Sequence, residues 1–196
     1  MKKICVLSGL LIALLVTGIV VKAKQIDLQK NLAEEVFRFH VLANSDSEED
    51  QALKMEVKEA VLNYMKEQLP KSDNVEMTKA WAAEHCTEIE QLAESLIQER
   101  GYDYPVRAKV TRCDFPEKSY GDITFPAGEY EALRIEIGKA KGQNWWCVLY
   151  PNLCFIDAVR AVVPENGKEE LKEVLDEQTY DMVTATTRFK IGWFFF

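Results

Sequence analysis

The segment VFRFHVLANSDSEEDQALK, residues 36–54, decides the start of the fold, because a strand pattern passes directly into a helix pattern. In its first part, apolar side chains alternate and favour a strand over 36–42; these are Phe37, Phe39 and Val41. Two overlapping capping boxes follow, Ser45 with Glu48 and Ser47 with Asp50. The segment therefore predicts a strand followed at once by a capped helix, and the capping explains the acidic run without a calcium site.

Two long helices are predicted after this strand. The first ends at Pro70 and keeps apolar residues at helical spacing: Leu53, Val57, Ala60, Val61 and Tyr64. The second covers 77–100, with Gly101 in the position of a left-handed C-cap. Its apolar stripe consists of Ala82, Cys86, Ile89, Ala93 and Leu96.

Strands dominate the rest of the chain. Alternating patterns cover 104–112, 129–138 and 145–150, and a further short strand lies within SYGDITFPAG, 119–128. A charged helical segment follows over 157–178, and a last strand is predicted over 188–193. Since no helices separate the later strands, we expect an α+β fold whose antiparallel sheet has both long helices on one face.

The N-terminus, MKKICVLSGLLIALLVTGIVVKAK (1–24), has the pattern of an export signal. Two lysines precede 18 uncharged residues, and the end of the segment offers a passable cleavage site. The apolar run is also just long enough to remain as a membrane anchor, and both outcomes stay open. We therefore expect a leader or anchor over 1–24 and a single domain over 25–196.

Without residues 1–24 the chain keeps 20 of its 24 basic residues and all 32 acidic ones, a net charge of −12. Nucleic acid is therefore not expected as a partner, and a membrane is expected to be contacted only through an uncleaved N-terminal segment. A protein partner suits this surface better.

Four cysteines follow the leader: Cys86, Cys113, Cys147 and Cys154. In GQNWWCVLYPNLCF (142–155), Cys147 and Cys154 are separated by six residues that include the turn formers Pro151-Asn152. Such a turn could bring the two cysteines within disulfide distance, and the alternative is two free thiols. Cys86 lies on an apolar stripe and is expected to be a buried, inert thiol. Cys113 is expected on the opposite face of its strand, so we do not expect it to pair with Cys86.

No established catalytic motif or CxxC pair occurs, and no cofactor, metal site or catalytic residue is predicted. His85 and Cys86 are neighbours on a helix and point about 100° apart, which argues against a dyad. Trp145 and Trp146 should face opposite sides of their strand, so one can serve as an interface anchor, although both could be core residues. Arg38 and His40 are expected on the neighbouring, less apolar surface.

Three blocks in this order behind an export signal resemble the stage II sporulation protein R family: 37–61 (FRFHVLANSDSEEDQALKMEVKEAV), 119–138 (SYGDITFPAGEYEALRIEIG), and 144–155 (NWWCVLYPNLCF). The resemblance implies a signalling protein without enzyme activity. It implies production in the forespore, export into the space between the forespore and mother-cell membranes, and activation there of a membrane-embedded aspartic protease that processes a pro-sigma factor. Within these blocks, the partner-binding candidates are Trp145, Trp146, Arg38 and His40.

Two other functions remain open from the residues alone. One is an exported hydrolase with a dispersed active site, which would require a perturbed acid or a Cys and a His in one cleft. The other is an envelope-binding module that stacks sugars on an exposed tryptophan.

Overall fold

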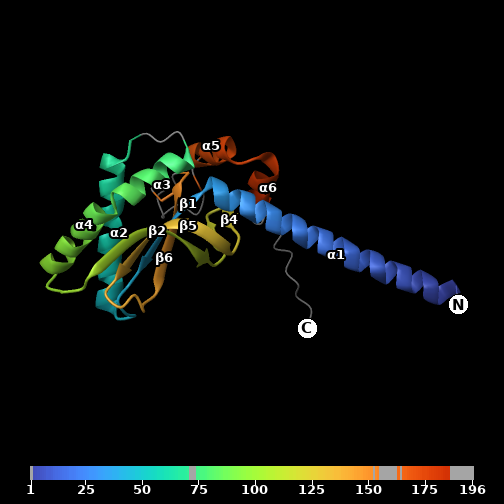
Figure 1. The fold of residues 1–196 in the computed structure, drawn as a ribbon, viewed down its shortest axis with the longest axis horizontal. Helices are drawn as coiled ribbons and strands as arrows, with labels where there is room; N and C mark the ends of the chain where they lie inside the picture. The colour runs from blue at the N-terminus through green and yellow to red at the C-terminus, as the bar shows by residue number, and fades with distance from the viewer. Residues whose placement is uncertain (1, 71–73, 152, 155–162, 164, 186–196) are drawn as a thin grey trace.

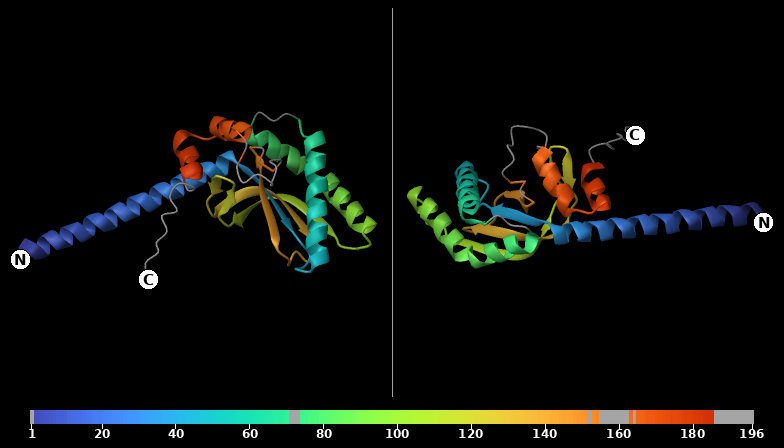
Figure 2. Two further views of the ribbon diagram at one scale, coloured as in Figure 1. Left: turned by 180° about the vertical axis from the view of Figure 1, so that it is seen from behind. Right: turned by 90° about the horizontal axis from the view of Figure 1, so that it is seen from above.

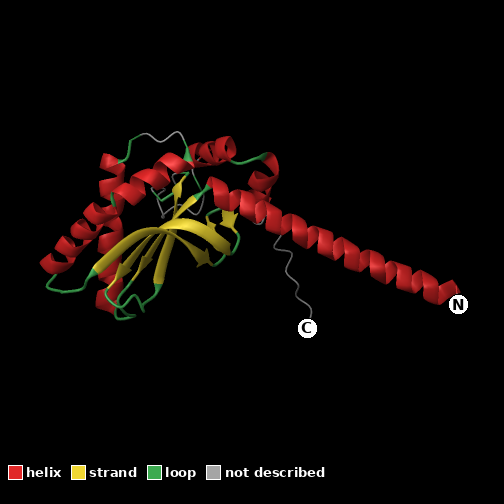
Figure 3. Cartoon of the chain, in the orientation of Figure 1, coloured by secondary structure: helices red, strands yellow, loops and turns green. Residues whose placement is uncertain are grey.

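A four-stranded sheet in the order β2-β5-β1-β6 forms the centre of the computed structural model (Figure 1), which describes residues 2–70, 74–151, 153, 154, 163 and 165–185. The helices are α1 (Lys2–Glu35), α2 (Glu48–Gln68), α3 (Val75–Glu84), α4 (Cys86–Glu99), α5 (Glu165–Val174) and α6 (Glu177–Ala185). The strands are β1 (Phe37–Leu42), β2 (Val106–Phe115), β3 (Lys118–Tyr120), β4 (Ile123–Phe125), β5 (Gly128–Ile137) and β6 (Asn144–Tyr150). The predicted α+β class is confirmed (Figure 3).

The sheet is mixed, so the predicted antiparallel sheet is confirmed only in part. β2 pairs antiparallel with β5, and β6 pairs antiparallel with β1, but β1 and β5 run parallel. The chain returns from β2 through the separate β3–β4 pair, and β5 then enters between β2 and β1 in the direction of β1. Sequence patterns give strand positions but not the neighbour that each strand selects.

The first face of the sheet carries the larger core, which is covered by α2, α3 and α4. Ser47 caps α2 as predicted, since its hydroxyl accepts the amide hydrogen of Asp50 at 3.2 Å. Phe37, Phe39 and Val41 are fully buried against these helices. The strand expected over 36–42 is therefore present, lies inside the sheet and packs on the helices.

The predicted second long helix is in fact two helices, α3 and α4, separated at His85. The His85 ring stacks on the indole of Trp81 at 4.1 Å, and its Nδ1 lies 2.8 Å from the Trp81 carbonyl oxygen. A side chain that binds a carbonyl one turn earlier disturbs the helical hydrogen-bond ladder. Both helices nevertheless pack on the same face, as expected.

The second face of the sheet carries a smaller core. It is covered by the C-terminal end of α1, the β3–β4 pair, α5 and α6, and Figure 2 shows α5 and α6 lying beside α1. All six residues of β1 are buried, because this strand is central and has helices or strands over both faces. The simple inside–outside alternation expected from the sequence therefore does not hold for β1.

Side chains and loops cover part of both edges of the sheet. On β2, the amide hydrogens of Val106 and Ala108 are accepted by carboxylates of α4, from Glu94 at 3.1 Å and Glu90 at 2.7 Å. On β6, the Tyr120 hydroxyl donates to the carbonyl oxygen of Trp146 at 3.3 Å. The carbonyl oxygen of Val148 accepts hydrogen bonds from the amides of Leu153 and Cys154, which follow the strand. Exposed strand edges promote aggregation, and these contacts shield part of each edge.

The N-terminal segment forms the single helix α1, which projects away from the sheet (Figure 1) and passes through the expected boundary at residue 24. Its last turns contribute to the second core through Leu32, and Val36 follows it there. In the part of the chain whose side chains the structure describes, no helix has the length and apolarity needed to cross a membrane. The strand expected over 188–193 and the start of the helix expected over 157–178 lie outside the described residues.

Candidate functional site

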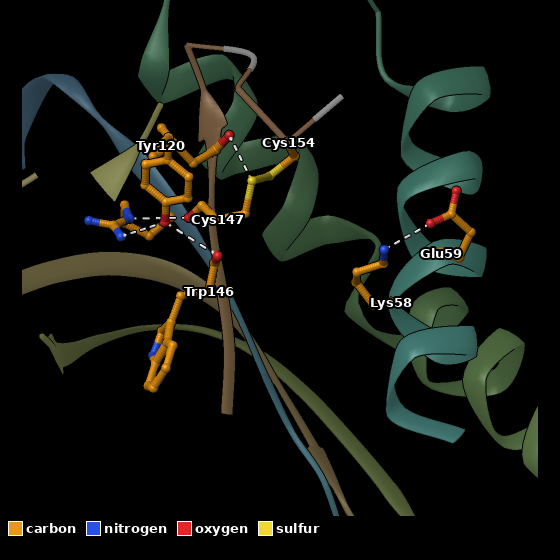
Figure 4. Close-up of a disulfide and its surroundings, with 8 residues drawn as sticks. Lys58, Glu59, Tyr120, Trp146, Cys147 and Cys154 are labelled. Atoms are coloured by element: carbon orange, nitrogen blue, oxygen red, sulfur yellow. Dashed lines mark hydrogen bonds and ion pairs between the residues drawn. A yellow bond between two sulfur atoms is a disulfide. The ribbon is translucent and has the colours of Figure 1, made fainter. Parts of the chain in front are cut away.

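A disulfide joins Cys147 of β6 to Cys154 (Figure 4), with the two Cα atoms 5.5 Å apart. The turn between them folds back on the strand, because the amides of Leu153 and Cys154 both donate to the carbonyl oxygen of Val148, at 3.2 and 3.0 Å. The pairing predicted from the spacing is confirmed. Cys86 and Cys113 are free, and they contact the cores of opposite faces, as expected.

Trp145 and Trp146 face opposite sides of β6, as the strand prediction required. Trp145 packs edge-on against Phe39, with ring centroids 5.7 Å apart, and the Lys58 ammonium lies 5.2 Å from its ring centroid. Trp146 stacks on His40 at 5.7 Å and carries the Lys118 ammonium 4.3 Å above its ring. Both indoles are half-buried, so the expected division into one core and one free tryptophan is not observed.

Arg38 and His40 do not lie on the surface, which corrects the expected position of both. Arg38 is 0 % exposed and His40 is 5 % exposed. Both side chains lie on the second face of the sheet. The alternating pattern indicated that this face is less apolar, but the second core covers it at this point. Neither side chain is accessible to a partner in this structure.

The Arg38 guanidinium lies in a cage of aromatic rings. Its Cζ atom is 4.3 Å from the ring centroid of Phe115, 4.9 Å from that of Tyr130 and 5.2 Å from that of Phe125. These ring faces attract a desolvated cation, which reduces the free-energy cost of burying the charge of Arg38. Arg38 thereby connects β1 to β2, β4 and β5.

Arg38 also holds the strand that bears the disulfide. Its Nε donates to the carbonyl oxygen of Cys147 at 3.1 Å, and Nη2 donates to the Tyr120 hydroxyl at 3.1 Å. Tyr120 donates in turn to the carbonyl oxygen of Trp146 (Figure 4). A buried residue thus fixes the backbone of β6 at the two positions that carry the half-buried indole and the disulfide.

The His40 imidazole lies 3.8 Å from the Cys113 thiol, measured from Nδ1 to Sγ, and this contact is the obvious place to look for a nucleophile. Burial lowers the pKa of His40 to about 4, although a hydrogen bond with Asn144 opposes this shift. Burial also raises the pKa of the Cys113 thiol. Both groups are therefore neutral near pH 7. A cysteine nucleophile requires the thiolate, so this pair lacks the activation that a cysteine hydrolase uses.

His85 and Cys86 do not form a dyad either. His85 Nδ1 contacts the Trp81 carbonyl oxygen, whereas the Cys86 thiol donates to the Ala82 carbonyl oxygen at 3.2 Å. Burial raises the pKa of Cys86, as expected for an inert thiol. Within the described part of the chain, no group of three or more His, Cys, Asp or Glu side chains could hold a metal ion.

The acidic run 45–50 is used for capping and local hydrogen bonds. Asp50 is 5 % exposed, accepts hydrogen bonds from Asn44 and Ser45, and thereby has a lowered pKa despite its burial. Its carboxylate is already occupied by protein donors, which agrees with the capped helix expected from the sequence.

Sequence reasoning did not find Tyr120, Lys118, Arg134 or the aromatic cage of Arg38. Tyr120 and Lys118 reach β6 only through the position of the β3–β4 pair, and Arg134 lies near it only through the order of the strands. One signal was present: the alternation in YPVRAKVTR places Arg107 and Lys109 together on the face opposite the helices.

Comparison with known proteins gives one consistent match. The family model for stage II sporulation protein R matches residues 33–160. The chain is 32 % identical over 192 residues to the stage II sporulation protein R of Bacillus subtilis (strain 168), covering 94 % of this chain and 86 % of that protein. No solved structure matches. The matched region contains the whole central sheet, the disulfide and both tryptophans of β6.

Proposed function

The chain belongs to the stage II sporulation protein R family, and we propose that it is an exported signal between the two cells of a sporulating bacterium. On this proposal it is made in the forespore and exported into the space between the forespore and mother-cell membranes. There it activates a membrane-embedded aspartic protease of the mother cell, which processes a pro-sigma factor. The role in sporulation follows from the family; the route and the partner are the proposal.

The export step is supported by the N-terminal sequence, in which two lysines precede 18 uncharged residues. The disulfide between Cys147 and Cys154 agrees with an oxidising compartment outside the cytoplasm. The N-terminal pattern and the pairing of Cys147 with Cys154 support export separately, because they come from different parts of the chain.

A binding role is favoured over catalysis because the His40 and Cys113 side chains, which contact each other, are both neutral. The contact has the composition of a nucleophile and its base, but burial shifts the two pKa values in the directions that prevent activation. A ligand can switch a receptor without chemistry if it binds the active state more tightly than the inactive one. A shift from mostly inactive to mostly active takes about 5.5 kcal/mol of differential binding.

We propose Trp146 as the principal contact residue and Trp145 as a second one. A half-buried indole can contribute several kcal/mol at an interface because it becomes desolvated there with little loss of side-chain entropy. Arg38 and His40 are buried, so their proposed role is to position Trp146. Arg38 acts through Tyr120, which donates to the Trp146 carbonyl oxygen, and His40 acts by stacking on the indole.

The test is co-expression of the exported full chain with the candidate protease and its pro-sigma substrate, with cleavage followed on a gel. Cleavage should depend on the chain and on its export. Cleavage that is equally strong without the chain, or no cleavage when all three are present and exported, would contradict the proposed function.

A further inference from the structure

The second face of the sheet carries a row of residues that crosses all four strands. Strand register aligns Lys109 of β2 with Arg134 of β5, Arg134 with His40 of β1, and His40 with Trp146 of β6. The next row starts with Arg107, which pairs with Glu136. Cationic side chains from β2 and β5 therefore lie on the same face as the indole that we propose as the contact residue.

This row is accessible at its β2 and β5 end and half-buried at Trp146, whereas His40 between them is only 5 % exposed and the adjoining part of the face is covered. The second core buries Ala132 and Val148, which lie one row further along the sheet. In contrast, the Lys109 side chain is 52 % exposed, Arg107 is exposed, and the Arg134 side chain is 26 % exposed.

Positive charge exceeds negative charge on this surface. Arg134 and Lys109 share a single carboxylate, Glu136, at 2.8 and 3.7 Å. Arg107 and Lys118 have no ion-pair partner within the part of the chain that the structure describes. This cationic surface stands out in a protein with a net charge of −8.

We infer that a cationic surface beside Trp146 binds an acidic segment of the protein partner, an inference that rests on the proposed function. The surface consists of Arg107, Lys109, Lys118 and Arg134. Tryptophan and arginine are the residue types most enriched at interface hot spots. Charge complementarity favours a segment rich in Asp and Glu, because the remaining surface of this acidic protein repels such a segment and orients it toward these cations. The same net charge opposes binding to an anionic bilayer.

The inference is tested by charge reversal at two exposed positions away from the second core, Arg107→Glu with Lys109→Glu. The matched control is Lys66→Glu with Arg112→Glu, which changes the net charge equally at exposed positions outside this surface. We expect the first double variant to lower pro-sigma cleavage at least tenfold and the control to stay within twofold of wild type. Melting temperature and tryptophan fluorescence establish that both variants are folded.

A second measurement uses the purified extracytoplasmic part of the protease as the probe and follows its binding to the full chain at low and high salt. Binding should weaken with salt for wild type, and the conservative pair Arg107→Lys with Lys109→Arg should retain it. If wild type activates the protease and the charge-reversed variant is equally active, the inference is wrong and the proposed function stands. If wild type itself neither binds nor activates, both fail.

A third arm separates a protein partner from a lipid. Vesicles containing phosphatidylglycerol are mixed with wild type and with the charge-reversed variant, and co-sedimentation is measured. We expect no difference between them. Binding of wild type that the reversal abolishes, together with unchanged binding to the protease, would assign the surface to anionic lipid and overturn the inference.

Discussion

Arg38 and Tyr120 lie 82 residues apart in the sequence, and their side chains meet through a 3.1 Å hydrogen bond from Nη2 to the phenol oxygen. This contact joins the central strand of the sheet to the separate β3–β4 pair. Because Tyr120 then donates to the backbone of Trp146, the contact also determines how β6 presents its indole.

Replacing Arg38 with Ala should lower the free energy of unfolding by about 3 kcal/mol, because a large, fully buried side chain and its hydrogen bonds are lost. Arg38→Met fills much of the same volume without the charge and should cost less. Urea denaturation measures both. A loss below about 1 kcal/mol in Arg38→Ala would mean that the aromatic cage contributes little, and equal losses in the two variants would mean that the filled volume contributes little.

Replacing Phe39 with Ala should cost about 3 to 5 kcal/mol, because the ring is fully buried between the sheet and the helices. The control is Met55→Ala on α2, where the side chain is 41 % exposed and the cost should stay below about 0.5 kcal/mol. Urea denaturation of both variants provides the comparison. A cost below about 1 kcal/mol at Phe39 would contradict its place in the core.

Thiol titration of denatured, unreduced protein lacking the leader should find two reactive thiols, Cys86 and Cys113. Replacing the paired cysteines with Ser should lower the free energy of unfolding by about 2.5 kcal/mol on the chain-entropy model for a loop of this length. Protein from the native compartment must be used, since the host compartment determines the redox state. Four reactive thiols would show that the disulfide does not form there.

The stability of the protein should fall as the pH is lowered from about 6.5 to 4, because His40 binds a proton more readily in the unfolded chain. Burial is the main reason that its pKa is low in the fold, with smaller contributions from Arg134 and Arg38, which lower it, and from Asn144 and Glu136, which raise it. The full effect is about 3 kcal/mol. Urea denaturation across this range should show a weaker pH dependence in His40→Gln, and identical profiles would exclude His40 as the cause.

Replacing Trp146 with Ala should reduce pro-sigma cleavage more strongly than replacing Trp145, because Trp146 lies beside the cationic surface and Trp145 packs over the main core. Both variants are first checked by circular dichroism and thermal melting. The assay is the co-expression experiment described above. Normal signalling by folded variants at both positions would move the contact to another part of the molecule.

The sequence by itself determined the positions of most elements and the disulfide. The α+β class, the capped helix that begins near Ser47 and the side of β1 that faces the helices all follow from local patterns, because capping and side-chain alternation depend on residues a few positions apart. The pairing of Cys147 with Cys154 is local for the same reason.

The tertiary structure alone decided which faces of the sheet are covered and which strands are neighbours. Arg38 and His40 alternate with the core residues of β1 and were therefore expected at the surface. They are buried because the second face is covered by segments more than 70 residues away in the chain, including Phe115 and Tyr120. The cationic surface beside Trp146 likewise exists only because β5 lies parallel to β1, which brings Arg134 between Lys109 and His40. Such contacts depend on the free energy of packing the whole chain, which no local pattern contains.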